Sequence, residues 1–158
     1  MTLEQYASLA EIIGLILVIG SLVYVAQQLR QNTQMMRSRA SGERVQRDAE
    51  LSLMVSGSGE FAEIWLKGRS EFEGLNEVER IRLIFHSRTA IVHWHNMFNM
   101  RTQNLLSDSD WNELVWVIEH FIRDRQDTHE AWKMFKDSFD EPFQKFLDAH
   151  LAVVAPPS

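Results

Sequence analysis

Five side chains near the middle of the sequence are of types that bind metal ions. Neutral imidazoles and carboxylates are common ligands of zinc and iron. The stretch HSRTAIVHWHN carries three histidines, and an adjacent Glu-His pair follows further along the chain. If the helices that carry them pack as a hairpin, a pair of imidazoles meets the glutamate or the fourth histidine. The candidate ligands of this His/Glu metal site are His86, His93, His95, Glu119 and His120.

The spacing of these residues favours a structural role. His86 and His93 share one face of an ideal helix, whereas His95 is rotated from them by roughly 200°. Di-iron bundles use Glu-x-x-His and helical zinc sites use His-Glu-x-x-His, and the sequence contains neither pattern. We therefore expect histidines that are hydrogen-bonded or at the surface, and no cofactor. A membrane-tethered His/Glu metalloenzyme remains the alternative hypothesis.

Motifs for other kinds of catalysis are also missing. Ser70 and Ser87 do not stand in a Gly-x-Ser-x-Gly turn. The glycine-rich SGSGE at 56–60 lacks the lysine of a phosphate-binding loop and follows no predicted strand, so it is interpreted as a linker. The net charge of -6 disfavours nucleic acid as a partner, because phosphate binding needs a concentrated basic surface. The sequence thus predicts a protein that is not an enzyme.

Helices are the elements that must position these side chains. Asn76 followed by Glu79 predicts a helix start, as does SDSDW at 107–111, and Pro142 fits the first turn of a last helix. No stretch alternates like a strand, and five tryptophans with nine phenylalanines can fill a helical core. We expect one apolar stripe in the last helix and a broader one in the helix that starts near Val78. The last helix contributes Phe143, Phe146, Leu147 and Leu151, and the other contributes Val78, Ile81, Phe85 and Val92, broadened by Ile84, Ile91 and Phe98.

The N-terminal segment predicts a transmembrane helix. About 20 apolar residues cross the roughly 30 Å of hydrocarbon in a bilayer, and 6–26 supplies this length with Glu11 as its only charge. Thr2 and Gln5 form a capping pattern, and a helix continuous to Ala40 is nearly 60 Å long, at about 1.5 Å per residue. The predicted fold is therefore all-α, with a transmembrane helix that continues into a stalk, followed by a small cytoplasmic helical bundle.

The predicted organisation has four parts. A transmembrane helix and juxtamembrane stalk occupy 1–40, a second stalk helix and linker 41–56, a helical head 57–153 and a loose tail 154–158. The charged residues at the N-terminal side of the span, Glu4 and Glu11, are both acidic, and several arginines follow the span. The positive-inside rule therefore places the N-terminus outside and the head in the cytoplasm. The arginines expected to contact the membrane surface are Arg30, Arg37, Arg39, Arg44 and Arg47.

Small and polar residues form a stripe along the predicted span. Four of them recur every seven residues, and a fifth lies one helical turn before Gly14. Small residues let helices approach closely in lipid, where packing and hydrogen bonds drive association. The stripe predicts contact with a second copy or with another membrane protein, although it would also suit the lining of a pore. This helix-association face consists of Ala7, Ala10, Gly14, Ser21 and Gln28.

Several longer patterns extend over nearly the whole chain. The N-terminal apolar helix runs into QLRQNTQMMRS, and FAEIWLKG, LNEVERIRLIF, HWHNMFNMRTQNLLSDSDW and AWKMFKDSFDEPFQKFLDAHL follow. In these features the chain resembles a widespread group of small, uncharacterised bacterial membrane proteins. The resemblance implies a single-pass, all-helical protein of the bacterial inner membrane, and it brings no active-site residues.

Three hypotheses about function follow. The first is a non-enzymatic membrane protein that acts through helix association, either as a homo-oligomeric scaffold or as an accessory subunit of a membrane complex. Its partners are then the lipid bilayer and either itself or another membrane protein. The rivals are the metalloenzyme and a small-ligand sensor whose aromatic head binds an apolar molecule.

Overall fold

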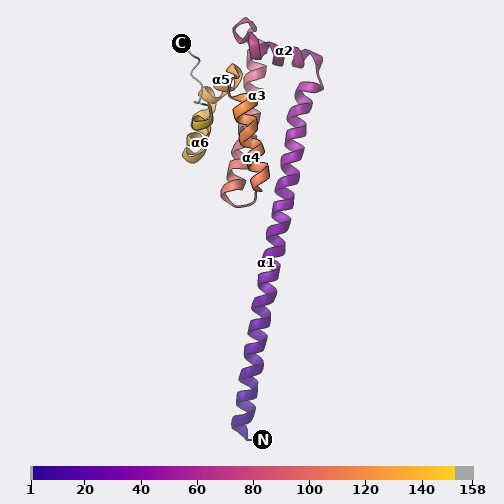
Figure 1. Ribbon diagram of the computed structural model, residues 1–158, viewed down its shortest axis with the longest axis vertical. Helices are drawn as coiled ribbons and strands as arrows, with labels where there is room; N and C mark the ends of the chain where they lie inside the picture. Colours follow the sequence, from indigo (N-terminus) through magenta and orange to yellow (C-terminus); the bar gives the residue numbers. More distant parts are fainter. Residues whose placement is uncertain (1, 152–158) are drawn as a thin grey trace. The chain divides into compact units, whose positions relative to one another are not determined.

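The computed structural model describes residues 2–151, apart from the side chain of Leu9. Within this range the chain forms helices and turns and no strand, which confirms the all-α prediction (Figure 1). The six α-helices are α1 Leu3–Ser56, α2 Gly59–Ser70, α3 Glu77–Thr102, α4 Asp108–Val117, α5 Gln126–Phe135 and α6 Glu141–Leu151. Three short helical turns join them: η1 Phe72–Gly74, η2 Ile118–Ile122 and η3 Lys136–Ser138. The predicted tail, 154–158, and the last two residues of the predicted head lie outside the described residues.

The predicted second stalk helix does not exist as a separate element, because α1 continues through Gly42 without a break. A glycine inside a helix costs only about 1 kcal/mol relative to alanine, and the flanking residues are mostly good helix formers. The chain divides into two compact units, Met1–Arg39 and Ala40–Ser158. The end of α1, from Ala40 to Ser56, therefore belongs to the helical domain and is not a stalk.

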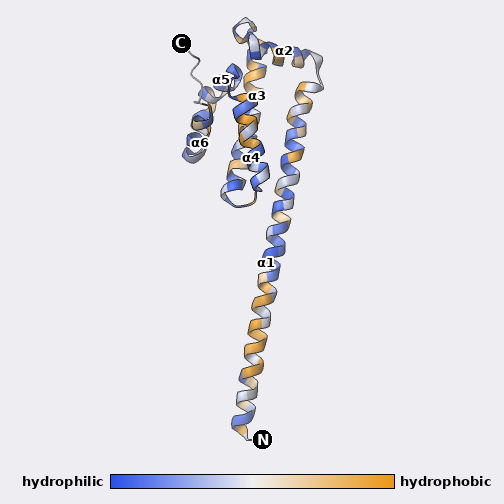
Figure 2. Ribbon diagram, in the orientation of Figure 1, coloured by the Kyte–Doolittle hydropathy of each residue, from blue (hydrophilic) through white to orange (hydrophobic). Residues whose placement is uncertain are grey.

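In the first unit, α1 carries large apolar side chains on every side. Ile16, Leu17 and Val18 are 62%, 65% and 56% exposed, and none of the most apolar window of α1 is buried against the protein. Figure 2 shows this part of α1 as a nearly continuous apolar segment. Among the described residues, α1 is the one helix long and apolar enough to cross a membrane.

The second unit is built around α3. Helix α5 packs along it, and α2, α4 and α6 complete the domain. One core cluster joins Ile91 and Met97 of α3 to Ile118 of η2 and Phe143 of α6, all of them at most 2% exposed. A smaller cluster joins α2 and η1 to Leu83 of α3. Here a Cβ atom on Gly68 would collide with the Leu83 side chain, so α2 and α3 approach closely because position 68 is glycine.

The helix starts follow the predicted capping chemistry. Asn76 and Glu79 form a complete capping box at α3, in which each side chain accepts a hydrogen bond from the other residue's backbone N–H. Ser107 caps α4, and Ser58, in the middle of SGSGE, caps α2. At the first helix, the Gln5 side chain accepts from Thr2 N.

The buried face of α3 agrees only in part with the predicted stripe: Ile91 is buried and Ile84 and Phe98 are half-buried, as expected. Val78, Ile81, Phe85 and Val92 are all at least 42% exposed. The buried residues of α3 are Leu83, Ser87, Ile91, His93, Trp94 and Met97. Because α3 is apolar on more than one side, its sequence does not determine which side packs, and the contacts with α2 and α5 decide it. The α6 prediction is confirmed: Phe143, Leu147 and Leu151 are buried and Phe146 is half-buried.

Candidate functional site

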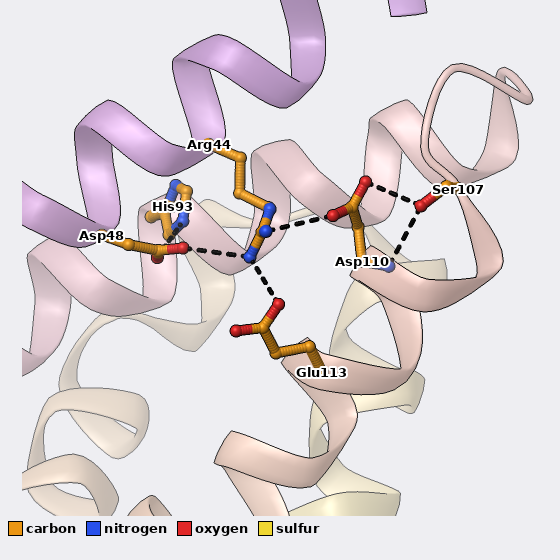
Figure 3. Close-up of polar contacts among 6 residues, drawn as sticks. All are labelled: Arg44, Asp48, His93, Ser107, Asp110 and Glu113. Atoms are coloured by element: carbon orange, nitrogen blue, oxygen red, sulfur yellow. Dashed lines mark hydrogen bonds and ion pairs between the residues drawn. The ribbon is translucent and has the colours of Figure 1, made fainter.

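Three carboxylates, one from α1 and two from α4, converge on Arg44 of α1 (Figure 3). The guanidinium Nη1 lies 3.2 Å from Asp48 Oδ2 and 2.9 Å from Glu113 Oε2, and Nη2 lies 3.0 Å from Asp110 Oδ1. Asp48 is also 3.1 Å from Nε2 of the buried His93 on α3. We call these five residues the Arg44 cluster. It joins the end of α1 to both α3 and α4.

The start of α4 supplies the acidic residues of the cluster. Asp110 lies in the first turn of α4, where the positive end of the helix dipole stabilises a carboxylate. Ser107 holds its second oxygen: the hydroxyl donates to Asp110 Oδ2 over 2.7 Å and accepts from Asp110 N over 3.1 Å. Glu113 follows one turn later. The helix cap that was predicted from SDSDW thus also positions an ion pair to another helix.

The Arg44 cluster carries an excess of negative charge. Three carboxylates surround one guanidinium, which leaves two negative charges, and one remains even if His93 is counted as protonated. Arg44 is only 13% exposed, whereas Asp48 and Glu113 are 47% and 60% exposed. The cationic group is thus covered, and two of the three acidic groups, Asp48 and Glu113, are accessible.

A groove of about 450 Å³ begins at the Arg44 cluster and lies between α1, α3 and α4. Its size is within the range of small-molecule sites, roughly 300–1,000 Å³. Arg44, Asp48 and Glu113 line it together with His86, and most of the remaining lining is apolar. We call it the α1–α3 groove; its main apolar lining residues are Leu51, Val55, Ala90, Trp94, Leu114 and Val117.

A π-helical turn shapes one wall of the groove. In η2 the hydrogen bonds join residues five apart, as in the 2.8 Å bond from Arg123 N to Ile118 O. The residue that follows Val117 along the groove is therefore Ile122, which lines it, whereas Phe121 is 49% exposed. Single π-helical turns within α-helices occur frequently at functional sites.

His86 lies beside a buried polar network. Arg125 Nε and Asp127 Oδ1 are 3.0 Å apart at 3% and 0% side-chain exposure, and the Ser87 hydroxyl donates to Asp127 Oδ2 over 2.6 Å. Burial lowers the pKa of His86; the Asp127 carboxylate opposes this effect and the Arg125 guanidinium adds to it. The Nδ1 atom of His86 is buried and has no hydrogen-bond partner among the described residues. Its surroundings therefore favour the neutral imidazole.

The candidate metal ligands are not brought together. His93 Nε2 contacts Asp48, His95 Nε2 contacts Asp140 at 2.6 Å, and His120 Nδ1 contacts the backbone oxygen of Trp116. The expected approach of an imidazole pair to Glu119 does not occur: Glu119 lies 3.8 Å from His150 instead. Within residues 2–151 no three His, Asp or Glu side chains are arranged to hold a metal ion. The helices separate these residues because they lie on different faces.

The predicted membrane-surface arginines fall into two groups. Arg30, Arg37 and Arg39 are exposed on the first unit. Arg44 and Arg47 belong to the second, where the Arg44 side chain is only 13% exposed and lies against three carboxylates. Arg47 is 66% exposed and pairs with Glu50 at 2.8 Å on its own helix.

The predicted helix-association face is exposed along its whole length in the first unit. A Cβ atom on Gly14 would meet nothing within 4 Å among the described residues. Ser21 Oγ donates to Leu17 O over 2.8 Å, and Gln28 Nε2 donates to Tyr24 Oη over 2.8 Å. Both polar groups are thus bonded within α1. The stripe consists of Ala7, Ala10, Gly14, Ser21 and Gln28, all of them exposed.

Comparison with known proteins found no matching family model, no matching curated protein and no matching solved structure.

Sequence reasoning missed the Arg44 cluster and the α1–α3 groove. Asp48, Asp110 and Glu113 looked like ordinary surface residues of separate helices. The spacing of five residues could have indicated that this part of α1 packs on the domain, because it places them on one helix face. These residues are Ala40, Arg44, Asp48, Leu51 and Val55. These residues are the buried or half-buried ones that face the domain or the groove.

Proposed function

We propose that this chain is a single-pass inner-membrane protein that acts through helix association and not through catalysis. The observation that carries the proposal is the segment of α1 from Ile12 to Ala26, where apolar side chains around the whole helix are exposed and no described part of the protein covers them. A helix that is apolar all round needs either a protein core or lipid as its surroundings. The first unit of the described structure supplies no core, so lipid is the proposed solvent.

The polar groups of this segment are compatible with lipid. The hydrogen bonds of Ser21 and Gln28 stay within α1, so neither group is left without a partner in hydrocarbon. The charges that flank the segment support an N-terminus outside and a cytoplasmic domain. The resemblance to small bacterial membrane proteins is consistent with this orientation.

The orientation is testable with single cysteines, because the sequence contains none. Thr2→Cys and Ser109→Cys place a thiol at each side of the proposed membrane. In intact bacterial spheroplasts, a membrane-impermeant maleimide should label Thr2→Cys at once and Ser109→Cys only after lysis. Labelling of both before lysis would overturn the single-pass topology, and the reverse pattern would overturn the orientation.

The association itself is proposed to use the small-residue stripe. Gly14→Leu should lower the mass of the purified particle in detergent, measured by light scattering, because the larger side chain separates the helices. Gly20→Leu is the matched control: it has the same chemistry and the same open surroundings, but lies about 120° from Gly14 around the helix. If both variants kept the wild-type mass, the stripe would not be the association face.

The kind of partner distinguishes a scaffold from an accessory subunit. Gentle extraction from native membranes followed by affinity purification should yield this chain alone if it forms a homo-oligomeric scaffold. Stoichiometric additional chains would instead support an accessory subunit of a larger complex. Gly14→Leu should reduce the number of associated chains per particle, whether these are further copies or other proteins, and Gly20→Leu should not.

A further inference from the structure

The α1–α3 groove extends along α1 and α3. Helices α1 and α3 run in opposite directions, because Arg44 and Met100 share one hollow whereas Met54 shares another with Arg82. Asp48 and His93 meet between these ends. Counting along both helices from this pair places Arg44 near Met97 at one end and Val55 near His86 at the other, and all four residues line the groove. The helix rises by roughly 16 Å from Arg44 to Val55, at about 1.5 Å per residue. A linear molecule fits this space better than a compact one.

The walls along this length are apolar. Leu51 and Val55 face the groove from α1, Ala90 and Trp94 from α3, and Leu114 from α4. Protein interiors normally leave few voids larger than a water molecule. Ala90 is a small side chain on the middle of one wall, where a larger residue would fill the space. The sequence thus leaves room for an alkyl chain.

The two ends of the groove differ in charge. At the His86 end the nearby Arg125 and Asp127 compensate each other. At the Arg44 end the three carboxylates leave an excess of negative charge, and Asp48 and Glu113 are the accessible members. An anionic head group would meet these carboxylates at close range, whereas a cation would be attracted.

We propose that the α1–α3 groove binds a single-chain cationic amphiphile, with its alkyl chain along the apolar walls and its ammonium group beside Asp48 and Glu113. The apolar chain is bound by burial, and the carboxylates select the charge of the head. This site lies wholly within the second unit, and it does not depend on whether the first unit lies in lipid.

Three photoreactive probes test the proposal. Each is a twelve-carbon chain with a mid-chain diazirine, and they end in a primary amine, a hydroxyl or a carboxylate. The full-length protein is placed in phosphatidylcholine nanodiscs, irradiated with each probe, digested with trypsin and analysed by mass spectrometry. Peptides 48–67, 89–101 and 102–123 contain the groove walls, and peptide 1–30 contains the proposed membrane span.

The amine probe is expected to label the three groove peptides about fivefold more than the carboxylate probe, relative to peptide 1–30 in each case. The hydroxyl probe should fall between them. Equal labelling by all three probes, a preference for the carboxylate, or no groove labelling by any probe overturns the proposal. The last result is the one expected if a second copy or another protein fills the groove. Absence of label on peptide 1–30 would instead count against the membrane-span proposal.

Two variants separate the chain-binding part from the charge selection. Ala90→Phe fills the groove and should reduce labelling of the groove peptides about fivefold with the amine probe, whereas Ala149→Phe, on an exposed position of α6, should not. Glu113→Gln keeps the groove open and should bring the amine and hydroxyl probes to similar labelling of the groove peptides. If circular dichroism shows that Ala90→Phe does not fold, Glu113→Gln alone tests the proposal. An unchanged amine preference in Glu113→Gln contradicts the proposed head-group site.

Discussion

Between Ile12 and Ala26, α1 presents apolar side chains in every direction, whereas from Ala40 onward one face packs against protein and the exposed faces mix polar, charged and apolar residues. Ile16 and Leu17 are more than 60% exposed, and neighbouring positions around the helix are equally apolar. In the second part, Ala40 is buried, and Arg44 and Asp48 are bonded to α3 and α4. One continuous helix therefore has two surfaces suited to different surroundings. An all-round apolar surface is typical of a membrane span, and a one-sided surface is typical of a helix that packs on a domain.

The largest effect on the free energy of unfolding is expected from disrupting the buried ion pair between Arg125 and Asp127 in the second unit. Arg125→Met leaves the Asp127 carboxylate buried without its cation, which should lower the free energy of unfolding of the domain by about 3–5 kcal/mol. Urea denaturation followed by tryptophan fluorescence measures this change. Arg123→Met, at a more exposed arginine two residues earlier, should change it by less than about 1 kcal/mol.

Arg125→Met also tests the difference between the two regions. If lipid stabilises the first unit and internal contacts stabilise the second, this variant should remain in the membrane fraction to the same extent as wild type. A parallel loss of membrane retention and domain stability would show that the two regions are not independent.

A charge placed in the first region should act on membrane insertion. Ile16→Arg adds a cation near the centre of the proposed span, at a cost of about 2.5–3.5 kcal/mol on insertion scales. The fraction resistant to alkaline carbonate extraction should fall accordingly. Leu53→Arg is the matched control, because Leu53 is 63% exposed on the same helix but lies in the second region. Equal retention of both variants would contradict the proposed difference in surroundings.

The Arg44 cluster should hold the end of α1 on the domain. Arg44→Met removes the cation shared by three carboxylates, and we expect the domain to lose about 1–3 kcal/mol of stability. Hydrogen exchange of residues 40–56 should become faster. Arg47→Met should have little effect, because Arg47 is exposed and pairs only locally among the described residues. Unchanged exchange in Arg44→Met would mean that apolar contacts alone hold this segment.

A smaller effect on the stability of the domain is expected from the protonation of His86 at low pH. Burial lowers its pKa in the folded state below the ordinary value of 6.5, so the folded state favours the neutral imidazole. This contribution to stability is fully present above about pH 6.5 and is lost as the pH falls toward the folded-state pKa. Wild type should therefore lose more stability than His86→Gln between about pH 7 and about pH 5, measured by urea denaturation at each pH. An equal loss in both proteins would contradict this assignment.

Much of the secondary structure could be predicted from local patterns. Asn76 with Glu79, and Ser107 before α4, act within one helical turn, so the sequence alone is sufficient to predict them. The continuity of α1 through Gly42 could not be predicted in this way. Helix propensity alone allows either a break or a continuous helix at that position.

The site was less predictable because it depends on packing between distant segments. The buried face of α3, the π-helical turn at Ile118–Ile122 and the meeting of Arg44 with Asp110 are all set by contacts between helices. The histidines attracted attention because of their type. Their positions on different faces of the helices direct them to separate partners.

The central claim is that one helix passes from lipid into a protein and water environment, and spin labels on single cysteines test it most directly. Ile16→Cys and Leu53→Cys are labelled separately, and collision rates with oxygen and with a water-soluble nickel complex are measured in nanodiscs. At position 16 we predict strong relaxation by oxygen and almost none by nickel, and at position 53 the reverse. Access of nickel to position 16 equal to that at position 53 would contradict the account.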